Sequence, residues 1–495
     1  MSSVQNERQG AGGTSTVLLE EVAELTTDLV DASGLDPDDA PDLPNVLSQL
    51  LDEVITTSEG VGEKPKFSLE LINGMMAEID RKLSAQVDEI LHDPAFKEVE
   101  SAWRGLRFLV DRTDFDQNIR IEMLDVSKQE LADDIEQRPT LRATRLCQVA
   151  YESKLGSYGN DPVGVIIGNY DFGPTAPDMQ LLEDISRVAA QAHAPFIAAA
   201  SPRFFNIKSF TGLPTRPKVD TKHHKRWQSF RQSDFANYVG LTLPRFLLRH
   251  PYDPEENPVR SFEYAEDVSG SHDEYLWGNA AFAFGSCLTD SFAKYRWCPN
   301  IVGPEGGGRI RNLPVHEYEA MGRAVVKPPT EVSLSMPRED ELSEQGFIPM
   351  IYENNSVNAV FFGANSTQRP KTFGNNPEDK KREGNFLLGT RLPYMMAVSR
   401  LAHHIQNYQR NKLGSTVSAS TLKSDLERWI RQYVSPQENL PESMLAQKPF
   451  YAVEFSVEDI EGKPGQYHVQ VNMQPRFKFE KAWFELSLVS ALGDD

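Results

Sequence analysis

The chain has 495 residues, of which 39% are hydrophobic and 25% charged, and its formal net charge at pH 7 is −21. This composition is that of a globular protein of about three domains, and it excludes a collagen-like or largely disordered chain. No apolar stretch reaches the roughly 18 residues of a membrane-spanning helix, and residues 1–13 do not have the pattern of a signal peptide. We therefore expect a cytoplasmic protein without membrane insertion.

The first 60 residues form an acidic arm. They contain 13 acidic side chains and one basic one, Arg8, so the arm carries −12 of the net charge and the other 435 residues only −9. Four apolar residues at helical spacing predict a short amphipathic helix in the arm, and Val46–Val54 predicts a second. The four are Leu18, Val22, Leu25 and Leu29. Such short helices are only marginally stable alone in water, so they indicate docking on this chain or on a partner. The alternative is that the arm is only a disordered solubilising tail.

Two longer helices are predicted where the acidic arm ends. The first follows the apolar stripe from Ser68 to Leu91, and the second begins at the cap Asp93 with Pro94 in its first turn, so the pair predicts a helical hairpin. Alternating apolar residues over 119–123 then predict a strand. A capping box of Ser127 and Glu130 predicts the start of another helix.

A βαβ unit is predicted next. Apolar runs at Val163–Ile167 and Phe196–Ala200 flank a helical pattern over 179–192, which indicates two parallel strands. The turn predicted at Gly168–Gly173 lacks the GxGxxG spacing of a dinucleotide site, and Gly306–Gly308 lacks the Lys-Ser/Thr of a phosphate-binding loop. The triple glycine therefore indicates a tight turn or close backbone packing.

The middle of the chain, residues 203–380, is rich in turns and is where a second domain or an insertion is expected. Helices are predicted over 394–413 and 420–434, followed by two alternating strands and one further strand at 484–488. Strands near a chain end can pair with a sheet edge of another chain, and head-to-tail pairing that does not close gives a helical filament. Pairing within their own domain is the alternative. The alternating residues are Tyr451, Val453, Phe455, Val457, Tyr467, Val469, Val471 and Met473.

No catalytic, cofactor-binding or metal-ligating residues are predicted. The sequence contains no HExxH and no GxSxG, and its three cysteines, Cys147, Cys287 and Cys298, lack the spacing of a zinc knuckle. Adjacent histidines at 223–224 and 403–404 do not face each other on a helix or strand, which argues against metal binding there.

A basic segment stands out in residues 203–231, with eight basic side chains, one acidic side chain and five aromatic ones. This pattern fits a nucleic-acid site where aromatics stack on bases. The acidic chain as a whole favours contact with an acidic protein surface or a solvated loop instead. The candidate contact residues are Lys222, Lys225, Arg226 and Arg231.

Several longer stretches resemble one family. They are HDPAFKEVESAWRGLRFLV from residue 92, AQAHAPFIAAASP from 190, VGLTLPRFLLRHPYDP from 239, WGNAAFAF from 277, GPEGGGRIRNLP from 303, SRLAHHIQNYQRNKLGS from 399 and EDIEGKPGQYHVQVNMQPRFKFE from 458. Together, over about residues 65–490, they resemble the large sheath subunit of the bacterial type VI secretion system, the VipB/TssC/EvpB family.

The resemblance implies an α/β, mixed-sheet contractile-sheath fold with a helical N-terminal segment, an inserted second domain and C-terminal strands that pair with neighbouring subunits. It implies no enzyme activity and no cofactor. The partners it implies are a small sheath subunit, further copies of the chain, an inner tube of hexameric rings, an envelope-anchored baseplate and an AAA+ ATPase that dismantles the contracted sheath. In the family the ATPase recognises an N-terminal helix, which by position corresponds here to Leu18, Val22, Leu25 and Leu29.

These expectations divide the chain into an acidic arm (1–64), a main sheath region (65–380) and a C-terminal sheath domain (381–495). Two alternatives stay open. One is a phage-tail-like sheath protein that polymerises without a small partner, and the other is a cytosolic α/β enzyme that uses the βαβ unit and needs a pocket with perturbed titratable groups.

Overall fold

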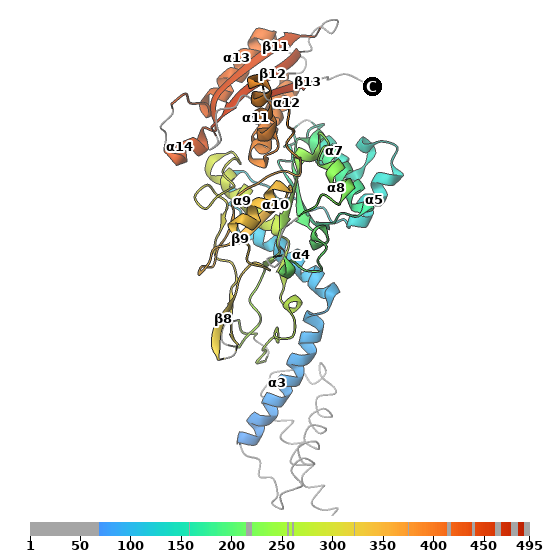
Figure 1. The fold of residues 1–495 in the computed structure, drawn as a ribbon, viewed down its shortest axis with the longest axis vertical. Helices are drawn as coiled ribbons and strands as arrows, with labels where there is room; N and C mark the ends of the chain where they lie inside the picture. The colour runs from blue at the N-terminus through green and yellow to red at the C-terminus, as the bar shows by residue number, and fades with distance from the viewer. Residues whose placement is uncertain are drawn as a thin grey trace, which may run out of the picture. The chain divides into compact units, whose positions relative to one another are not determined.

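The computed structural model describes residues 69–157, 159–213, 220–254, 257–259, 262–320, 322–374, 376–412, 417–437, 441–460, 467–476 and 484–489. The chain divides into two compact units, residues 1–83 and 84–495. The helices predicted at Leu18–Leu29 and Val46–Val54 lie outside the described residues. The second unit holds all the sheets of the described residues (Figure 1).

A six-stranded sheet forms the centre of the second unit. Its order is β1 (Ile166–Phe172), β2 (Phe196–Ala200), β3 (Val239–Leu243), β9 (Ile348–Tyr352), β10 (Ala359–Phe361) and β6 (Arg309–Ile310). The first four strands are parallel and the last two pairs antiparallel. The predicted βαβ unit is confirmed, with α7 (Ala176–Ala192) as the crossover helix.

The boundary of β1 differs from the prediction. The strand begins at Ile166 and continues to Phe172, through residues predicted to form a turn. The physical reason is distant in sequence: Phe172 is buried, and its ring lies edge-on to Phe196 of β2 with centroids 5.9 Å apart. This contact keeps the chain extended past Gly168.

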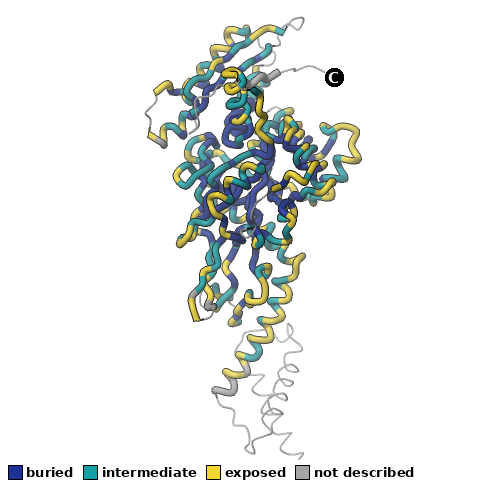
Figure 2. The backbone as a smooth tube through the Cα atoms, in the orientation of Figure 1, coloured by how far each residue is buried: buried dark blue, intermediate teal, exposed yellow. Residues whose placement is uncertain are grey.

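Helices cover both faces of the central sheet. Alternate side chains of a strand point to opposite faces, and in β2 Phe196 and Ala198 pack in one apolar core with α7, whereas Ile197 packs in another with α9 (Ala280–Tyr295). Strands β2 and β3 are buried at every position, as expected for strands covered on both sides. Figure 2 shows the buried residues gathered in the interior of this unit, in the strands and in the helices packed on them.

The first helices form as their capping residues predict. Helix α3 (Leu69–Leu91) precedes α4 (Pro94–Asp111), and the Asp93 carboxylate accepts hydrogen bonds from the backbone N–H groups of Ala95 and Phe96 at 2.9 and 3.1 Å. The capping box of Ser127 and Glu130 opens α5 (Lys128–Gln137). Because α3 crosses the boundary between the two units, the hairpin geometry stays a prediction.

The strand predicted at 119–123 is wrong as a paired strand. The structure places no helix or strand at residues 118–126, and residues 118–125 form no backbone hydrogen bonds with other described backbone groups. The alternation of Ile119, Ile121 and Met123 is real, but no described strand pairs with it. A short helical passage follows α5, with α6 (Arg145–Cys147) leading into a π-helix over Gln148–Glu152.

The middle region is not a separate layer, because it supplies β3, β6, β9 and β10 to the central sheet. It also contains α8 (Lys225–Phe230) and α10 (Met336–Glu344). Two small antiparallel pairs lie outside the central sheet, namely β4 (Phe246–Leu247) with β5 (Trp277–Gly278) and β7 (His316–Ala320) with β8 (Arg323–Lys327). An inserted domain stays a prediction, and these two pairs are the described strands of the region that lie outside the central sheet.

The C-terminal region has its own sheet and core. Helices α11 (Pro377–Gly389), α12 (Leu392–Lys412), α13 (Ala419–Ile430) and α14 (Glu442–Gln447) precede the strands. Strands β11 (Phe450–Asp459), β12 (Tyr467–Pro475) and β13 (Phe484–Val489) form an antiparallel sheet in that order, with α13 packed against β11 (Figure 1). The three predicted strands are confirmed.

Candidate functional site

The C-terminal strands hold the residues predicted to pair between subunits. Within the chain β11 pairs with β12, so that Val453 lies opposite Met473 and Phe455 opposite Val471. Side chains of this set face α12 and α13 in one apolar core, where Phe455, Val469, Val471 and Met473 are buried and Val453, Val457 and Tyr467 are half-buried. Tyr451 is half-buried under the Arg476 guanidinium.

These side chains are therefore used inside their own domain. What the described sheet offers to a neighbour is backbone, along the outer edge of β11 and the outer edge of β13. The start of the β11 edge is already covered, because Ser435 N–H donates to Phe450 O at 3.1 Å. The pairing of these strands between subunits stays a prediction.

The predicted basic patch is corrected at one position. Arg231 is buried, and its guanidinium donates to the backbone oxygens of Thr367 and Glu344 at 3.0 and 2.8 Å. Burial, together with the charge of Arg369, lowers the pKa of Arg231 to about 10. Arg231 therefore joins loops inside the molecule, and the exposed part of the patch consists of Lys222, Lys225 and Arg226.

The aromatic residues of the same segment are buried as well. Phe347 lies among them, with ring centroids 5.2 Å from Phe204, 5.3 Å from Phe205 and 5.4 Å from Trp227. Stacking on nucleic-acid bases needs exposed rings. The segment's aromatics belong to the protein core instead; they are Phe204, Phe205, Phe210, Trp227 and Phe230.

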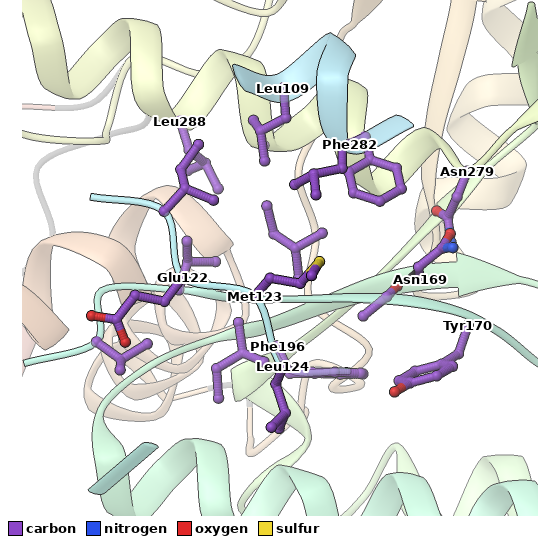
Figure 3. A pocket seen from close by; sticks show the side chains of 18 of the residues that line it. Leu109, Glu122, Met123, Leu124, Asn169, Tyr170, Phe196, Asn279, Phe282 and Leu288 are labelled. Carbon is purple, nitrogen blue, oxygen red and sulfur yellow. Dashed lines mark hydrogen bonds between the residues drawn. The ribbon is translucent and has the colours of Figure 1, made fainter. Parts of the chain in front are cut away.

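A large open cavity lies at the free edge of the central sheet, and we call it the β1 groove. It is bordered by β1, by residues 118–126, by α4 and by α9, and its volume is about 2270 Å³. In Figure 3 Leu109 of α4 and Phe282 and Leu288 of α9 lie across from Met123 and Leu124. Sequence reasoning missed this groove, although the apolar stripe of α4 was visible in the sequence.

The apolar stripe of α4, which runs through Val99, Trp103 and Val110, is not buried in the described chain, and the buried residues of this helix lie on another face. Gly105 and Leu109 face α9, where a side chain at 105 would collide with the Phe282 ring, whereas Val99 and Trp103 are 57% and 59% exposed. Val99 and Trp103 both line the β1 groove. Large apolar side chains that are left open in this way mark an interaction surface.

A buried ionic cluster ties α4 to the loop that follows β4. Arg249 donates to Glu266 at 2.5 Å and to Glu100 at 2.9 Å, and His92 lies 3.3 Å from Glu266. Burial alone would raise the pKa of Glu266, but hydrogen bonds from Arg249 and its positive charge lower that pKa overall. The cluster is compensated internally, and its geometry is that of a structural clamp.

Histidines make the stability of the fold dependent on pH. Burial lowers the pKa of His193, His272, His403 and His404 from 6.5 to about 4. His403 is neutral with its Nε2–H donating to Ala192 O at 2.8 Å. The unfolded chain takes up these protons near pH 6.5 and the folded chain only near pH 4, so stability is full above about pH 6.5 and falls as the pH drops towards 4.

His403→Gln should reduce this pH dependence. The glutamine amide can still donate a hydrogen bond but takes up no proton, and each such histidine contributes up to about 1.4 kcal/mol per pH unit. Urea unfolding at pH 7, 6 and 5 measures the slope of stability against pH. A slope identical to that of the unmodified chain would show that His403 accepts a proton while folded.

Two further observations concern the described residues only. None of their helices is long and apolar enough to cross a bilayer. No group of three or more His, Cys, Asp or Glu side chains among them is arranged to hold a metal ion.

The site and fold together define a protein built to assemble with other chains, with an open apolar groove on one domain and free sheet edges on another. Residues 73–368 match the tail sheath N-terminal domain of EvpB/VC_A0108, and residues 381–492 match its tail sheath gpW/gp25-like domain. The chain is 36% identical over 435 residues to the type VI secretion system sheath protein TssC1 of Pseudomonas aeruginosa, which covers 86% of each chain.

A chain in the cryo-EM structure of the anti-feeding prophage baseplate is 9% identical, with a TM-score of 0.36, covering 77% of this chain and 84% of that chain. This likeness is too weak to support an argument about the fold. The family matches and the TssC1 relative are sufficient: the chain belongs to the EvpB/VC_A0108 tail sheath family, the large subunits of the type VI secretion contractile sheath.

Proposed function

We propose that this chain forms heterodimers with the small sheath subunit, and that the heterodimers polymerise helically around an inner tube of hexameric rings. The polymer stands on an envelope-anchored baseplate in the bacterial cytoplasm and contracts to propel the tube. The observation that carries this proposal is the family match across both domains of the chain. The role is structural, with no catalytic step assigned to any residue.

Co-expression with a tagged small subunit tests the heterodimer directly. The large subunit should co-purify in a one-to-one ratio, because the described chain leaves an apolar groove that needs a partner. Recovery of the tagged small subunit without this chain would contradict the proposal.

Contraction requires interfaces between subunits that are stable in two arrangements. The subunits must be able to move from one arrangement to the other while the polymer stays connected. The backbone edges of β11 and β13 suit this role, since strand pairing through backbone hydrogen bonds survives rotation of the domains around it. We assign the inter-subunit pairing to these edges. The core-facing side chains from Tyr451 to Met473 then support the sheet that carries the edges.

The exposed basic residues Lys222, Lys225 and Arg226 are assigned to contact with an acidic protein surface. Charge complementarity at such a rim mainly guides association and selects the partner.

The acidic arm is assigned to the AAA+ ATPase that dismantles the contracted sheath. The support is its position ahead of the family match at residue 73 and the helical spacing of Leu18, Val22, Leu25 and Leu29. An amphipathic helix recognised in a groove places its apolar face against the partner.

Leu18→Glu combined with Leu25→Glu should abolish ATPase binding and leave sheath assembly intact, because both charges fall on the apolar face of the predicted helix. Ala23→Glu with Thr27→Glu is the matched control, since it adds the same two charges on the opposite face. A pull-down with the ATPase measures binding. Equal binding by the two double variants would remove the arm from the recognition site.

A further inference from the structure

Four exposed basic side chains lie in and beside α8, and we call them the α8 patch. They are Arg203, Lys222, Lys225 and Arg226. No carboxylate of the described residues forms an ion pair with any of the four. On α9, by contrast, the exposed Lys294 pairs with Asp290 at 2.6 Å. In a chain with a net charge of −21, a surface of unpaired cations is suited to an acidic partner.

The protein core holds the backbone under the α8 patch. Trp227 and Phe230 of α8 are buried in the same apolar core as the crossover helix α7. The segment that carries Arg203 is tied to the start of α8, because His224 Nε2–H donates to Phe204 O at 3.0 Å. The patch is therefore presented on ordered backbone, and binding a partner does not require this backbone to be ordered first.

The chain itself contains an acidic segment of matching charge. Residues 31–42 of the acidic arm have the sequence DASGLDPDDAPD, with five aspartates and no basic residue. This segment lies outside the described residues, between the two helices predicted in the arm. Pro37 and Pro41 disfavour a helix in it. A contact through residues 31–42 leaves the helix predicted at Leu18–Leu29 to the ATPase.

Polymerisation favours a contact between copies of the chain. A basic surface and an acidic segment at different places on one chain form a head-to-tail contact, which can repeat along a helical polymer. Single exposed ion pairs contribute little. In a polymer, however, each arm is tethered next to its neighbour, which raises its effective concentration at the neighbour's patch to roughly the millimolar range. We therefore expect the contact in the assembled sheath rather than between free subunits.

We propose that the α8 patch of one copy binds residues 31–42 of the acidic arm of a neighbouring copy in the sheath. This inference rests on the proposed polymer and identifies the acidic protein surface that its exposed basic residues contact. Nucleic acid suits the patch less well, because the aromatic side chains of segment 203–231 are buried and cannot stack on bases.

Carbodiimide crosslinking of the polymer formed with the small subunit tests the contact. The reagent joins a lysine amine to a carboxylate only where the two groups meet. Mass spectrometry should therefore find links from Lys222 and Lys225 to aspartates of residues 31–42. Lys380 and Lys381 of α11 are also exposed and serve as the internal control. Equal yields of arm links at the control lysines would show that the arm has no preferred surface and would overturn the inference.

Mixed labelling shows which chain supplies the arm. Heterodimers whose large subunit contains light or heavy nitrogen are mixed in equal amounts before they polymerise. A contact between copies gives crosslinks in which a light patch peptide is joined to a heavy arm peptide, and the reverse. Crosslinks that never combine the two labels would mean that each arm binds its own chain, which contradicts the inference.

A reciprocal exchange of charge gives a second readout. The patch variant carries Lys222→Glu, Lys225→Glu and Arg226→Glu, and the arm variant carries Asp36→Lys, Asp38→Lys and Asp39→Lys. In either variant alone like charges face each other and no lysine meets a carboxylate, so the crosslinks should be lost. The combined variant should restore them, with the lysines now on the arm. The three patch residues are exposed, so the fold tolerates their change. No recovery in the combined variant would contradict the assigned contact.

The outcomes separate this inference from the proposed function. If tubes form without crosslinks between the patch and residues 31–42, the polymer stands and the patch has another partner. Nucleic acid that co-purifies with the tubes and shields the patch lysines from the reagent would overturn the inference in the same way. If the unmodified pair of subunits forms no tubes, both the proposed polymer and this inference fail.

Discussion

Replacing Arg249 with methionine is expected to lower the free energy of unfolding by about 3–5 kcal/mol. Arg249 holds two carboxylates, and the side chain of Glu266 is only 1% exposed. Without the guanidinium, Glu266 keeps His92 and the hydrogen bond from the Tyr252 N–H but loses its cation, so it must take up a proton or draw in water. Urea unfolding of the purified chain measures the loss.

Arg107→Met is the matched control for Arg249. Arg107 also pairs with a carboxylate, that of Asp111 at 3.3 Å, but the two side chains are 76% and 62% exposed. Exposed pairs contribute about 0–1 kcal/mol, so this variant should unfold close to the unmodified chain. Equal small losses for both variants would mean that water reaches Glu266, and the cluster would then not be a clamp.

Phe347→Ala is expected to cost about 3–5 kcal/mol as well, through a different mechanism. Phe347 is fully buried between Phe204, Phe205 and Trp227, and its removal leaves a cavity that three rigid rings cannot fill. Phe347 precedes β9, so the cavity would lie beside the central sheet. Thermal unfolding followed by intrinsic tryptophan fluorescence reports the loss at Trp227.

Phe373→Ala removes the same side chain from a surface position, where it is 48% exposed. The change should be below about 0.5 kcal/mol. A Phe347→Ala variant as stable as Phe373→Ala would contradict the assignment of the aromatic residues of segment 203–231 to the core.

The features that the sequence predicted well are those fixed by neighbouring residues. The Asp93 cap, the Ser127–Glu130 capping box and the alternation of β11 and β12 each depend on spacing within a few residues. The βαβ unit follows from two apolar runs separated by a helical pattern, and the second run, β2, is buried at every position. In all these cases local preference and tertiary packing agree.

The features that the sequence missed depend on distant contacts. Strand β1 extends to Phe172 because of Phe196, and Arg231 is buried because Thr367 and Glu344 accept its hydrogen bonds from more than 100 residues away. No spacing pattern contains such information. From the sequence alone, a charged residue among aromatic ones is therefore interpreted as part of a surface patch, because the groups that bind it inside the protein are distant in sequence.

The prediction of a paired strand within residues 118–125 failed for a different reason. The alternation over residues 119–123 predicts a strand, and the described chain gives that strand no partner. The same holds for α4, whose apolar stripe includes the exposed Val99 and Trp103, while the buried Gly105 and Leu109 lie on another face of the helix. Both patterns leave apolar side chains exposed in the described chain.

The central claim, a sheath subunit that needs a small partner, is tested most directly by negative-stain electron microscopy of the co-expressed pair. We expect long hollow tubes when both chains are present and none when this chain is expressed alone. Tubes formed by this chain alone would indicate a phage-tail-like sheath that polymerises by itself. Discrete particles from the co-expressed pair would contradict the account.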